Sequence, residues 1–167
     1  MKRCTLFRAF LTRIILVLAL GPIIAQIDSI AQDDIVLDKG LALGRVVRFT
    51  RSLLHVDPVE AQLVAGTWTQ PQTGAVAEGI GEATQSWTPV EADAQGVFLG
   101  RVFAGGYLYF AVESPVDRVM LLHAAGHSMA YINGEPRYVD PYGYNYTLLP
   151  VHLRAGINHL LVQCSRG

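Results

Sequence analysis

The last third of the chain consists of short apolar runs separated by turn sequences. Met129–Ile132 ends at Asn133-Gly134, and the next clear run, Leu149–Leu153, ends at Ala155-Gly156. A third run follows at once, from His159 to Cys164. Apolar runs of this length, bounded by Asn-Gly or by a turn containing Gly, are typical of antiparallel strands joined by tight turns. This pattern predicts sheet and leaves little room for amphipathic helix.

Further strand-like runs occur upstream at spacings of roughly ten residues, which is typical of a sandwich. We expect strands at Arg45–Phe49, near Trp87, at Gly106–Val112 and at Arg118–His123, and a loop or an irregular edge over residues 70–86. The predicted fold class is all-β: a two-layer antiparallel jelly-roll sandwich with one short helix, preceded by a signal peptide. The expected core positions are Leu108, Phe110, Val119, Leu121, Ile132, Leu160 and Val162.

One helix is expected after Asp57. Asp57 can cap it, Pro58 suits its first turn, and Glu60 has the spacing of a capping box. Gly66 would end this helix after about two turns.

The N-terminus has the pattern of a secretory signal peptide. Lys2, Arg3, Arg8 and Arg13 precede an apolar run at Ile14–Leu20, and small residues follow. The run is shorter than the ~20 residues that a spanning helix needs. We therefore expect export to the periplasm or the extracellular space. Cleavage would fall after Ala25 or Ala31, leaving residues 32–167 as one β-sandwich domain, which can be the N-terminal part of a longer protein.

Removal of this leader changes the charge of the chain. Four of the 13 basic residues leave with it, while all 14 acidic residues lie after position 25, so the net charge becomes 9 − 14 = −5. Lys39 is then the remaining lysine, and Cys164 the remaining cysteine. A lysine-poor, acidic chain offers no stripe for phosphates, so we expect no nucleic-acid partner and no membrane partner after cleavage.

Gly126-His127-Ser128-Met129-Ala130 differs from the G-x-S-x-G motif of serine hydrolases in its last residue. That motif requires a strained turn from a strand into a helix, with the acid and the base later in the chain. Here Asn133-Gly134 would end a helix within a few residues, and only 39 residues follow Ser128. We therefore predict a turn between two strands, and no catalytic residue.

The histidines suggest a metal site only weakly. His123 and His127 would lie about 13 Å apart on one face of a strand, which is too far for one ion. His152 and His159 flank the Ala155-Gly156 turn and lack a third ligand. We expect no metal and no cofactor.

Tyrosines gather in the excursion from Glu135 to Tyr146, which we expect to be the surface that binds any sugar. Aromatic planes beside amide and carboxylate groups can stack on a sugar ring and bind its hydroxyls, whereas packing of the tyrosines against the sandwich is the structural alternative. Trp87 is a weaker candidate for stacking. The predicted ligand-binding residues are Tyr138, Asp140, Tyr142, Tyr144, Asn145 and Tyr146.

Two motifs carry a family resemblance over roughly half the chain. They are Tyr131-Ile132-Asn133-Gly134 and the closing pattern Leu149-Pro150-Val151-x-Leu153-x-x-Gly156-x-Asn158-x-Leu160-Leu161-Val162. From about Trp87 onward the chain resembles the galactose-binding-domain-like jelly rolls of secreted glycoside hydrolases and peptidases. Asn133–Arg137 with Asp140–Tyr144 is similar to the N-terminal domain of secreted bacterial serine hydrolases of the prolyl-oligopeptidase type. In such proteins the catalytic domain follows the jelly roll.

Three functions are compatible with this sequence. The first is an exported non-catalytic accessory module that binds carbohydrate or supports a neighbouring C-terminal catalytic domain. The second is an N-terminal fragment of a secreted serine hydrolase or peptidase whose catalytic domain is missing here. The third is a structural or interaction domain without a small ligand.

Overall fold

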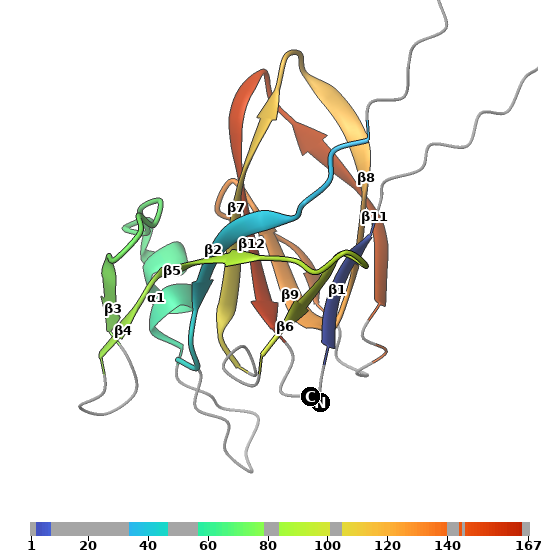
Figure 1. Cartoon of the computed structure of the whole chain (residues 1–167). Helices are drawn as coiled ribbons and strands as arrows, with labels where there is room; N and C mark the ends of the chain where they lie inside the picture. Colours follow the sequence, from blue (N-terminus) through green and yellow to red (C-terminus); the bar gives the residue numbers. More distant parts are fainter. Residues whose placement is uncertain are drawn as a thin grey trace, which may run out of the picture.

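The computed structural model describes residues 3–7, 34–46, 57–78, 84–100, 105–139, 144 and 146–164. These residues form two antiparallel sheets that face each other, with one helix beside them (Figure 1). The predicted all-β sandwich is therefore confirmed. Within the described ranges, α1 (Pro58–Ala65) is the sole helix, and no helix there is long and apolar enough to cross a membrane.

The strands of both sheets pair antiparallel to their neighbours. The four-stranded sheet has the order β11 (Tyr146–Leu153), β8 (Arg118–Ala125), β1 (Arg3–Phe7), β6 (Val97–Leu99). The six-stranded sheet has the order β10 (Glu135–Val139), β9 (His127–Ile132), β12 (Gly156–Cys164), β7 (Tyr107–Ser114), β2 (Lys39–Leu43), β5 (Thr88–Glu91). Strands β10 and β11 are thus edge strands of different sheets.

The main core lies between the two sheets. Strand β12 runs between β9 and β7, so that Leu160 is paired with both Ile132 and Phe110. Its alternate side chains at Leu160, Val162 and Cys164 are buried between the sheets, as the period of two in a strand requires. Five of the expected core residues are at most 6% exposed: Leu108, Phe110, Ile132, Leu160 and Val162.

The prediction for strand β8 was wrong by one position. Val119 is 60% exposed and Leu121 is only half-buried, whereas Leu122 and Ala124 are buried in the core. The run in β8 is apolar on both faces, so its sequence does not show which face turns inward. A shift of one residue exchanges the two faces completely.

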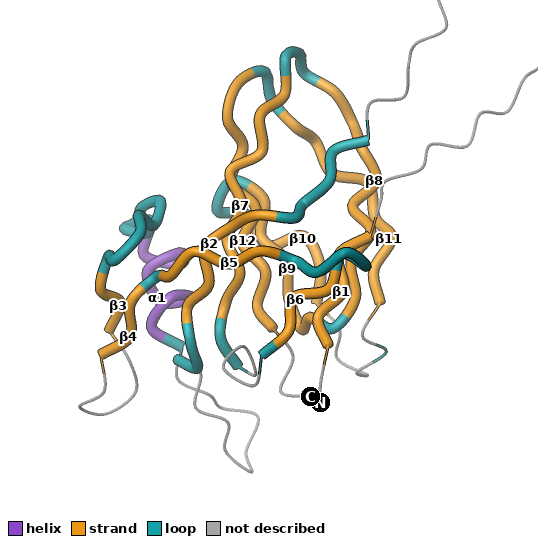
Figure 2. Tube along the Cα trace, in the orientation of Figure 1, coloured by secondary structure: helices purple, strands orange, loops and turns teal. Residues whose placement is uncertain are grey.

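A second hydrophobic cluster covers the outer face of the six-stranded sheet. Tyr107, Tyr109 and Leu161 point outward from their strands and pack with Val59 of α1 and with Trp87. Figure 2 shows α1 grouped with the hairpin of β3 (Val76–Glu78) and β4 (Thr84–Ser86) at this side of the sheet. The molecule therefore has a partial third layer, which is why Tyr107 and Tyr109 are buried.

The helix forms where its signals predict it. Oδ1 of Asp57 accepts hydrogen bonds from the backbone N–H groups of Val59 and Glu60, and Pro58 occupies the first turn. Gly66 ends the helix in the left-handed conformation, with φ of 67°. Local chemistry determines both boundaries, and both predictions are confirmed.

Three segments differ from expectation. The strand before α1 is β2 (Lys39–Leu43), while Arg45 and Val46 of the expected Arg45–Phe49 strand are not in a sheet, and residues 47–49 lie outside the described residues. The segment over residues 70–86, expected to be a loop or an irregular edge, contains the β3–β4 hairpin. Arg3–Phe7, inside the expected leader, forms β1 and pairs with both β6 and β8.

Candidate functional site

A polar pocket of about 190 Å³ lies at the open edge of the sandwich, where β10 and β11 approach each other. Its walls come from the turn after β9, from β10, and from the end of β11. A hydrogen bond of 3.3 Å from Nη2 of Arg137 to the carbonyl oxygen of Pro150 joins the two strands beside it. The lining residues are Ile132, Asn133, Glu135, Arg137, His152 and Arg154.

Two asparagines fix the shape of this pocket. Asn133 Nδ2 donates to Oδ1 of Asn158 over 3.0 Å, and Asn133 Oδ1 accepts from the backbone N–H of His159. Asn158 is 1% exposed and also bonds both the N–H and the carbonyl oxygen of Arg154. The turn that carries Asn133 is therefore tied to the turn that carries Arg154. These are the two motif asparagines of the sequence, and the structure gives each a bracing role.

The pocket carries an excess of positive charge. Arg137 and Arg154 are exposed, and neither forms an ion pair with any residue that the structure describes. Glu135 supplies the one carboxylate of the lining, and His152 supplies an imidazole. Guanidinium groups only donate hydrogen bonds, whereas an ionised carboxylate only accepts them. The pocket therefore offers both kinds of partner to a ligand rich in hydroxyls.

Sequence reasoning missed the pocket as a unit. It placed Glu135 and Arg137 at the start of the predicted binding segment, but it gave His152 and Arg154 no binding role. Glu135 and Arg137 lie in β10, whereas His152 lies in β11 and Arg154 directly follows it, and no spacing in the sequence signals that these two edges meet. One signal in the sequence could have indicated the pocket: Arg137 lies close to the Asn133-Gly134 turn, and Arg154 lies next to the Ala155-Gly156 turn.

The predicted tyrosine site is described only in part. Asp140, Tyr142 and Asn145 lie outside the described residues, and for Tyr138 only the backbone, in β10, is described. Tyr144 and Tyr146 are 77% and 51% exposed, and Tyr146 packs edge-on against His123 at 5.4 Å between ring centroids. Both are open to solvent, as a stacking role requires.

Tyr146 is remote from the polar pocket. Tyr146 begins β11 and His152 lies six residues further along it, which corresponds to about 20 Å in an extended strand. The two ends of the predicted binding segment therefore lie apart. Glu135 and Arg137 line the pocket, whereas Tyr146 lies at the far end of β11.

Ser128 lies in strand β9, which continues to Ile132 without any turn into a helix. Its hydroxyl donates to Oε1 of Gln163 over 2.7 Å. The amide of Gln163 in turn donates to Oδ2 of the buried Asp57, which also accepts from the hydroxyl of Tyr107. The geometry of a nucleophile elbow is absent at Ser128, and the serine belongs to a network that ties α1 to the sheet.

Burial and the neighbouring carboxylates act on the tyrosines of this network. Burial, followed by the charge of Asp57, raises the pKa of Tyr107 far above its usual range. Tyr131 donates to Glu60 over 3.3 Å, and burial and that carboxylate raise its pKa as well. Both phenols therefore stay protonated and act as hydrogen-bond donors that hold the helix.

The four histidines that the structure describes do not converge on one ion site. His127 is buried and pairs with Oγ1 of Thr147 at 2.9 Å, while His123 lies in β8 of the other sheet. His152 lines the polar pocket, whereas His159 stacks on Tyr109 at the outer face of the six-stranded sheet. In the part of the chain that the structure describes, no three metal-binding side chains lie together.

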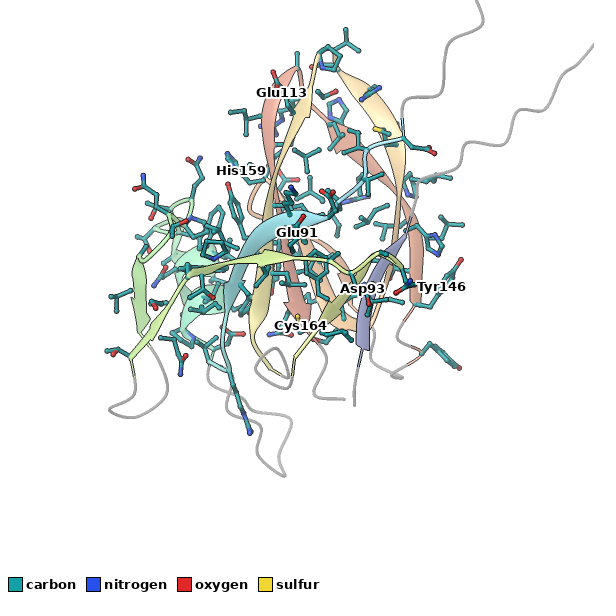
Figure 3. The ribbon with its side chains drawn as sticks, in the orientation of Figure 1. Glu91, Asp93, Glu113, Tyr146, His159 and Cys164 are labelled. Atoms are coloured by element: carbon teal, nitrogen blue, oxygen red, sulfur yellow. The ribbon has the colours of Figure 1, made fainter. Side chains whose placement is uncertain are left out.

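Aromatic rings gather on the outer face of the six-stranded sheet. His159 stacks on Tyr109 at 5.9 Å with its Nδ1 2.8 Å from the phenol oxygen, and Trp68 packs on Tyr109 at 6.2 Å. Burial lowers the pKa of His159. Figure 3 shows His159 and Tyr146 on opposite sides of the molecule. Trp87 is 5% exposed and packs inside the second cluster, so it does not present a ring for surface stacking.

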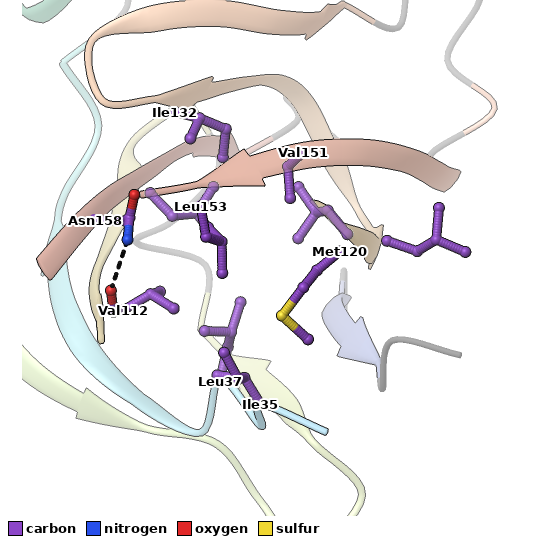
Figure 4. Close-up of a pocket in the computed structure, with 11 residues that line it drawn as sticks. Ile35, Leu37, Val112, Met120, Ile132, Val151, Leu153 and Asn158 are labelled. Carbon is purple, nitrogen blue, oxygen red and sulfur yellow. Dashed lines mark hydrogen bonds between the residues drawn. The ribbon is translucent and has the colours of Figure 1, made fainter. Parts of the chain in front are cut away.

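An apolar cavity of about 50 Å³ lies between the sheets, with Ile35 and Leu37 on one side of it (Figure 4). Met120, Val151 and Leu153 line it, and its amide group, Asn158, bonds to the carbonyl oxygen of Val112. A space of this size holds only a few water molecules at most, and its polar group is already bonded. Its small size and apolar lining make this cavity a poorer site than the polar pocket for a ligand rich in hydroxyl groups.

Comparison with known proteins identifies no family for this chain. No family model matches it, and no curated protein and no solved structure matches it significantly. The resemblance to galactose-binding-like modules stays a prediction that rests on the two sequence motifs.

Proposed function

We propose that the chain is an exported, non-catalytic accessory module that binds glycan in the polar pocket between β10 and β11. The observation that carries this proposal is the braced lining of the pocket. Asn133 and Asn158 hold two turns together, and these turns bring guanidinium, carboxylate and imidazole groups to one opening. Fixed donors and acceptors around an open pocket suit a ligand with many hydroxyl groups.

The size of the pocket limits what enters it. At about 190 Å³ it is smaller than the roughly 300–1,000 Å³ of pockets for drug-sized ligands. We expect a single sugar residue of a longer chain to occupy it. Such contacts are few, so the affinity should be weak, with a dissociation constant on the order of 0.1–1 mM.

A glycan array followed by calorimetry tests the proposal. The array carries neutral and acidic glycans, and the best binder is titrated as a free oligosaccharide into the purified protein. Arg154→Gln should weaken binding, whereas Arg45→Gln, the same change at an exposed arginine that is not in the pocket lining, should not. Absence of binding across the array would refute glycan recognition and favour an interaction domain without a small ligand.

The non-catalytic part of the proposal has its own test. A fluorophosphonate probe labels activated serines, whereas the Ser128 hydroxyl donates to the side-chain amide of Gln163, which is no general base. We expect no labelling of the protein. Stoichiometric labelling that is lost in Ser128→Ala would overturn this part and support a hydrolase.

A further inference from the structure

The charge of the polar pocket points to an acidic glycan: we propose that Arg137 and Arg154 hold the carboxylate or sulfate group of a charged sugar residue. This inference rests on the proposed function and specifies its ligand class. Uronates and sulfated sugars have one feature in common, an anionic group on a pyranose ring. This group is a planar carboxylate or a tetrahedral sulfate, and hydroxyl groups flank it.

The distribution of charge supports the assignment. Without its leader the chain would have nine basic and 14 acidic residues, so an average surface region would be negative. The pocket lining reverses this balance, with two arginines against one glutamate, and His152 beside them. A protein of net negative charge repels anionic polymers in general. Such a protein can bind an anionic polymer where cationic side chains are close together. The polar pocket brings Arg137 and Arg154 together in this way.

The two arginines reach the pocket from the edges of different sheets. Arg137 lies on β10 and is held by the carbonyl oxygen of Pro150, which uses one of its five N–H donors. Arg154 follows the end of β11, where Asn158 fixes its backbone through two hydrogen bonds. A guanidinium fork binds carboxylate or sulfate oxygens in pairs, with shorter and stronger hydrogen bonds than a neutral donor makes.

Glu135 favours a sugar acid over a bare anion or an acidic peptide. Its carboxylate repels a second negative charge, but it accepts hydrogen bonds from neutral hydroxyl groups. A uronate or a sulfated hexose presents one anionic group and several hydroxyls on the same ring. A run of glutamates presents anionic groups alone, so Glu135 would oppose it.

The decisive experiment compares matched pairs of ligands. One pair is tetragalacturonate and its methyl ester, and the other is a sulfated galactan oligosaccharide and its unsulfated form. We expect the charged member of at least one pair to bind about tenfold more tightly, because charge-assisted hydrogen bonds exceed neutral ones by about that factor in affinity. The preferred pair then identifies carboxylate or sulfate. The preference should shrink as salt is raised, because exposed charges are screened.

Three pocket variants and one control locate the effect, and all four are checked for a native circular dichroism spectrum. Arg137→Gln and Arg154→Gln should each reduce the preference for the charged ligand about tenfold. Arg154→Lys should recover only part of it, because a lysine keeps the charge and loses the fork. Arg45→Gln serves as the control outside the pocket lining and should leave the preference unchanged.

The outcomes separate this inference from the proposed function. Equal binding of charged and neutral glycans would overturn the acidic preference and leave glycan binding intact. Binding of hexaglutamate as tightly as any glycan would overturn the glycan as ligand. No binding of any glycan would overturn both proposals.

Discussion

Asn158 is the residue on which the geometry of the pocket depends most. It is buried, and its side chain bonds to Asn133 and to both backbone groups of Arg154. Alanine at this position would leave several buried groups without a partner, and each costs about 1–3 kcal/mol. We expect Asn158→Ala to lower the free energy of unfolding by roughly 3 kcal/mol in urea titrations. Ile157→Ala, next to it and 66% exposed, should change it by less than about 0.5 kcal/mol.

His159 should make stability depend on pH. Burial lowers its pKa in the folded protein below the ordinary value of 6.5, so the unfolded chain takes up the proton first as pH falls. The stabilising effect of the neutral ring is complete above about pH 6.5 and is lost as pH falls from there towards the folded pKa. His159→Gln should therefore show a smaller loss of unfolding free energy between about pH 7.5 and pH 5 than the wild type. An identical pH slope in both proteins would contradict this account.

Individual residues also show which features can be predicted from the sequence and which cannot. Asn133-Gly134 was recognised as a turn because Asn and Gly tolerate positive φ, and both adopt it here, at 53° and 85°. Arg154 was not recognised as a pocket residue, because its neighbour Arg137 belongs to a different sheet. Turn chemistry is local, whereas a pocket between two sheet edges depends on long-range pairing.

At the scale of elements, the helix was predictable and the β3–β4 hairpin was not. The signals for α1 are its own cap and its own terminal glycine, which act within a few residues. Strands Val76–Glu78 and Thr84–Ser86 are three residues each and contain little apolar periodicity. Such short strands form through their pairing and through packing beside α1, and that context is absent from the local sequence.

Strand β7 depends on a glycine at its start. A Cβ on Gly106 would overlap the carbonyl oxygen of Leu43 and lie 2.9 Å from the carbonyl carbon of Gly44. Both are backbone atoms next to the β2–β7 pairing, so they cannot move aside cheaply. We expect Gly106→Ala to lower the free energy of unfolding by about 2–3 kcal/mol, as overpacking does.

A second glycine provides the control for that experiment. Gly66 has a φ of 67°, and a Cβ added there would meet open space, so Gly66→Ala tests the conformational cost alone. This cost is about 1 kcal/mol. Equal losses from Gly66→Ala and Gly106→Ala would show that the close approach of β2 to β7 does not limit stability.

At the scale of the whole molecule, the predicted leader and the four-stranded sheet both include residues 3–7, and these two roles exclude each other. The basic and apolar pattern of the N-terminus predicts removal on export, while β1 pairs with β6 and β8 inside the sheet. We expect the exported protein to begin at Gln26 or Gln32, as measured by intact mass. A mass that includes Met1 would instead identify β1 as a permanent strand and refute cleavage.

A ligand that binds at the edge of the sandwich between β10 and β11 should perturb the residues around the polar pocket. An NMR titration of the isotopically labelled protein with the best-binding oligosaccharide tests it most directly. We predict that amide shifts concentrate at residues 132–137 and 152–158, around the turns braced by Asn133 and Asn158. Shifts confined to Tyr144 and Tyr146, or to the aromatic rings around Trp68, would contradict the claim and move the binding site away from the pocket.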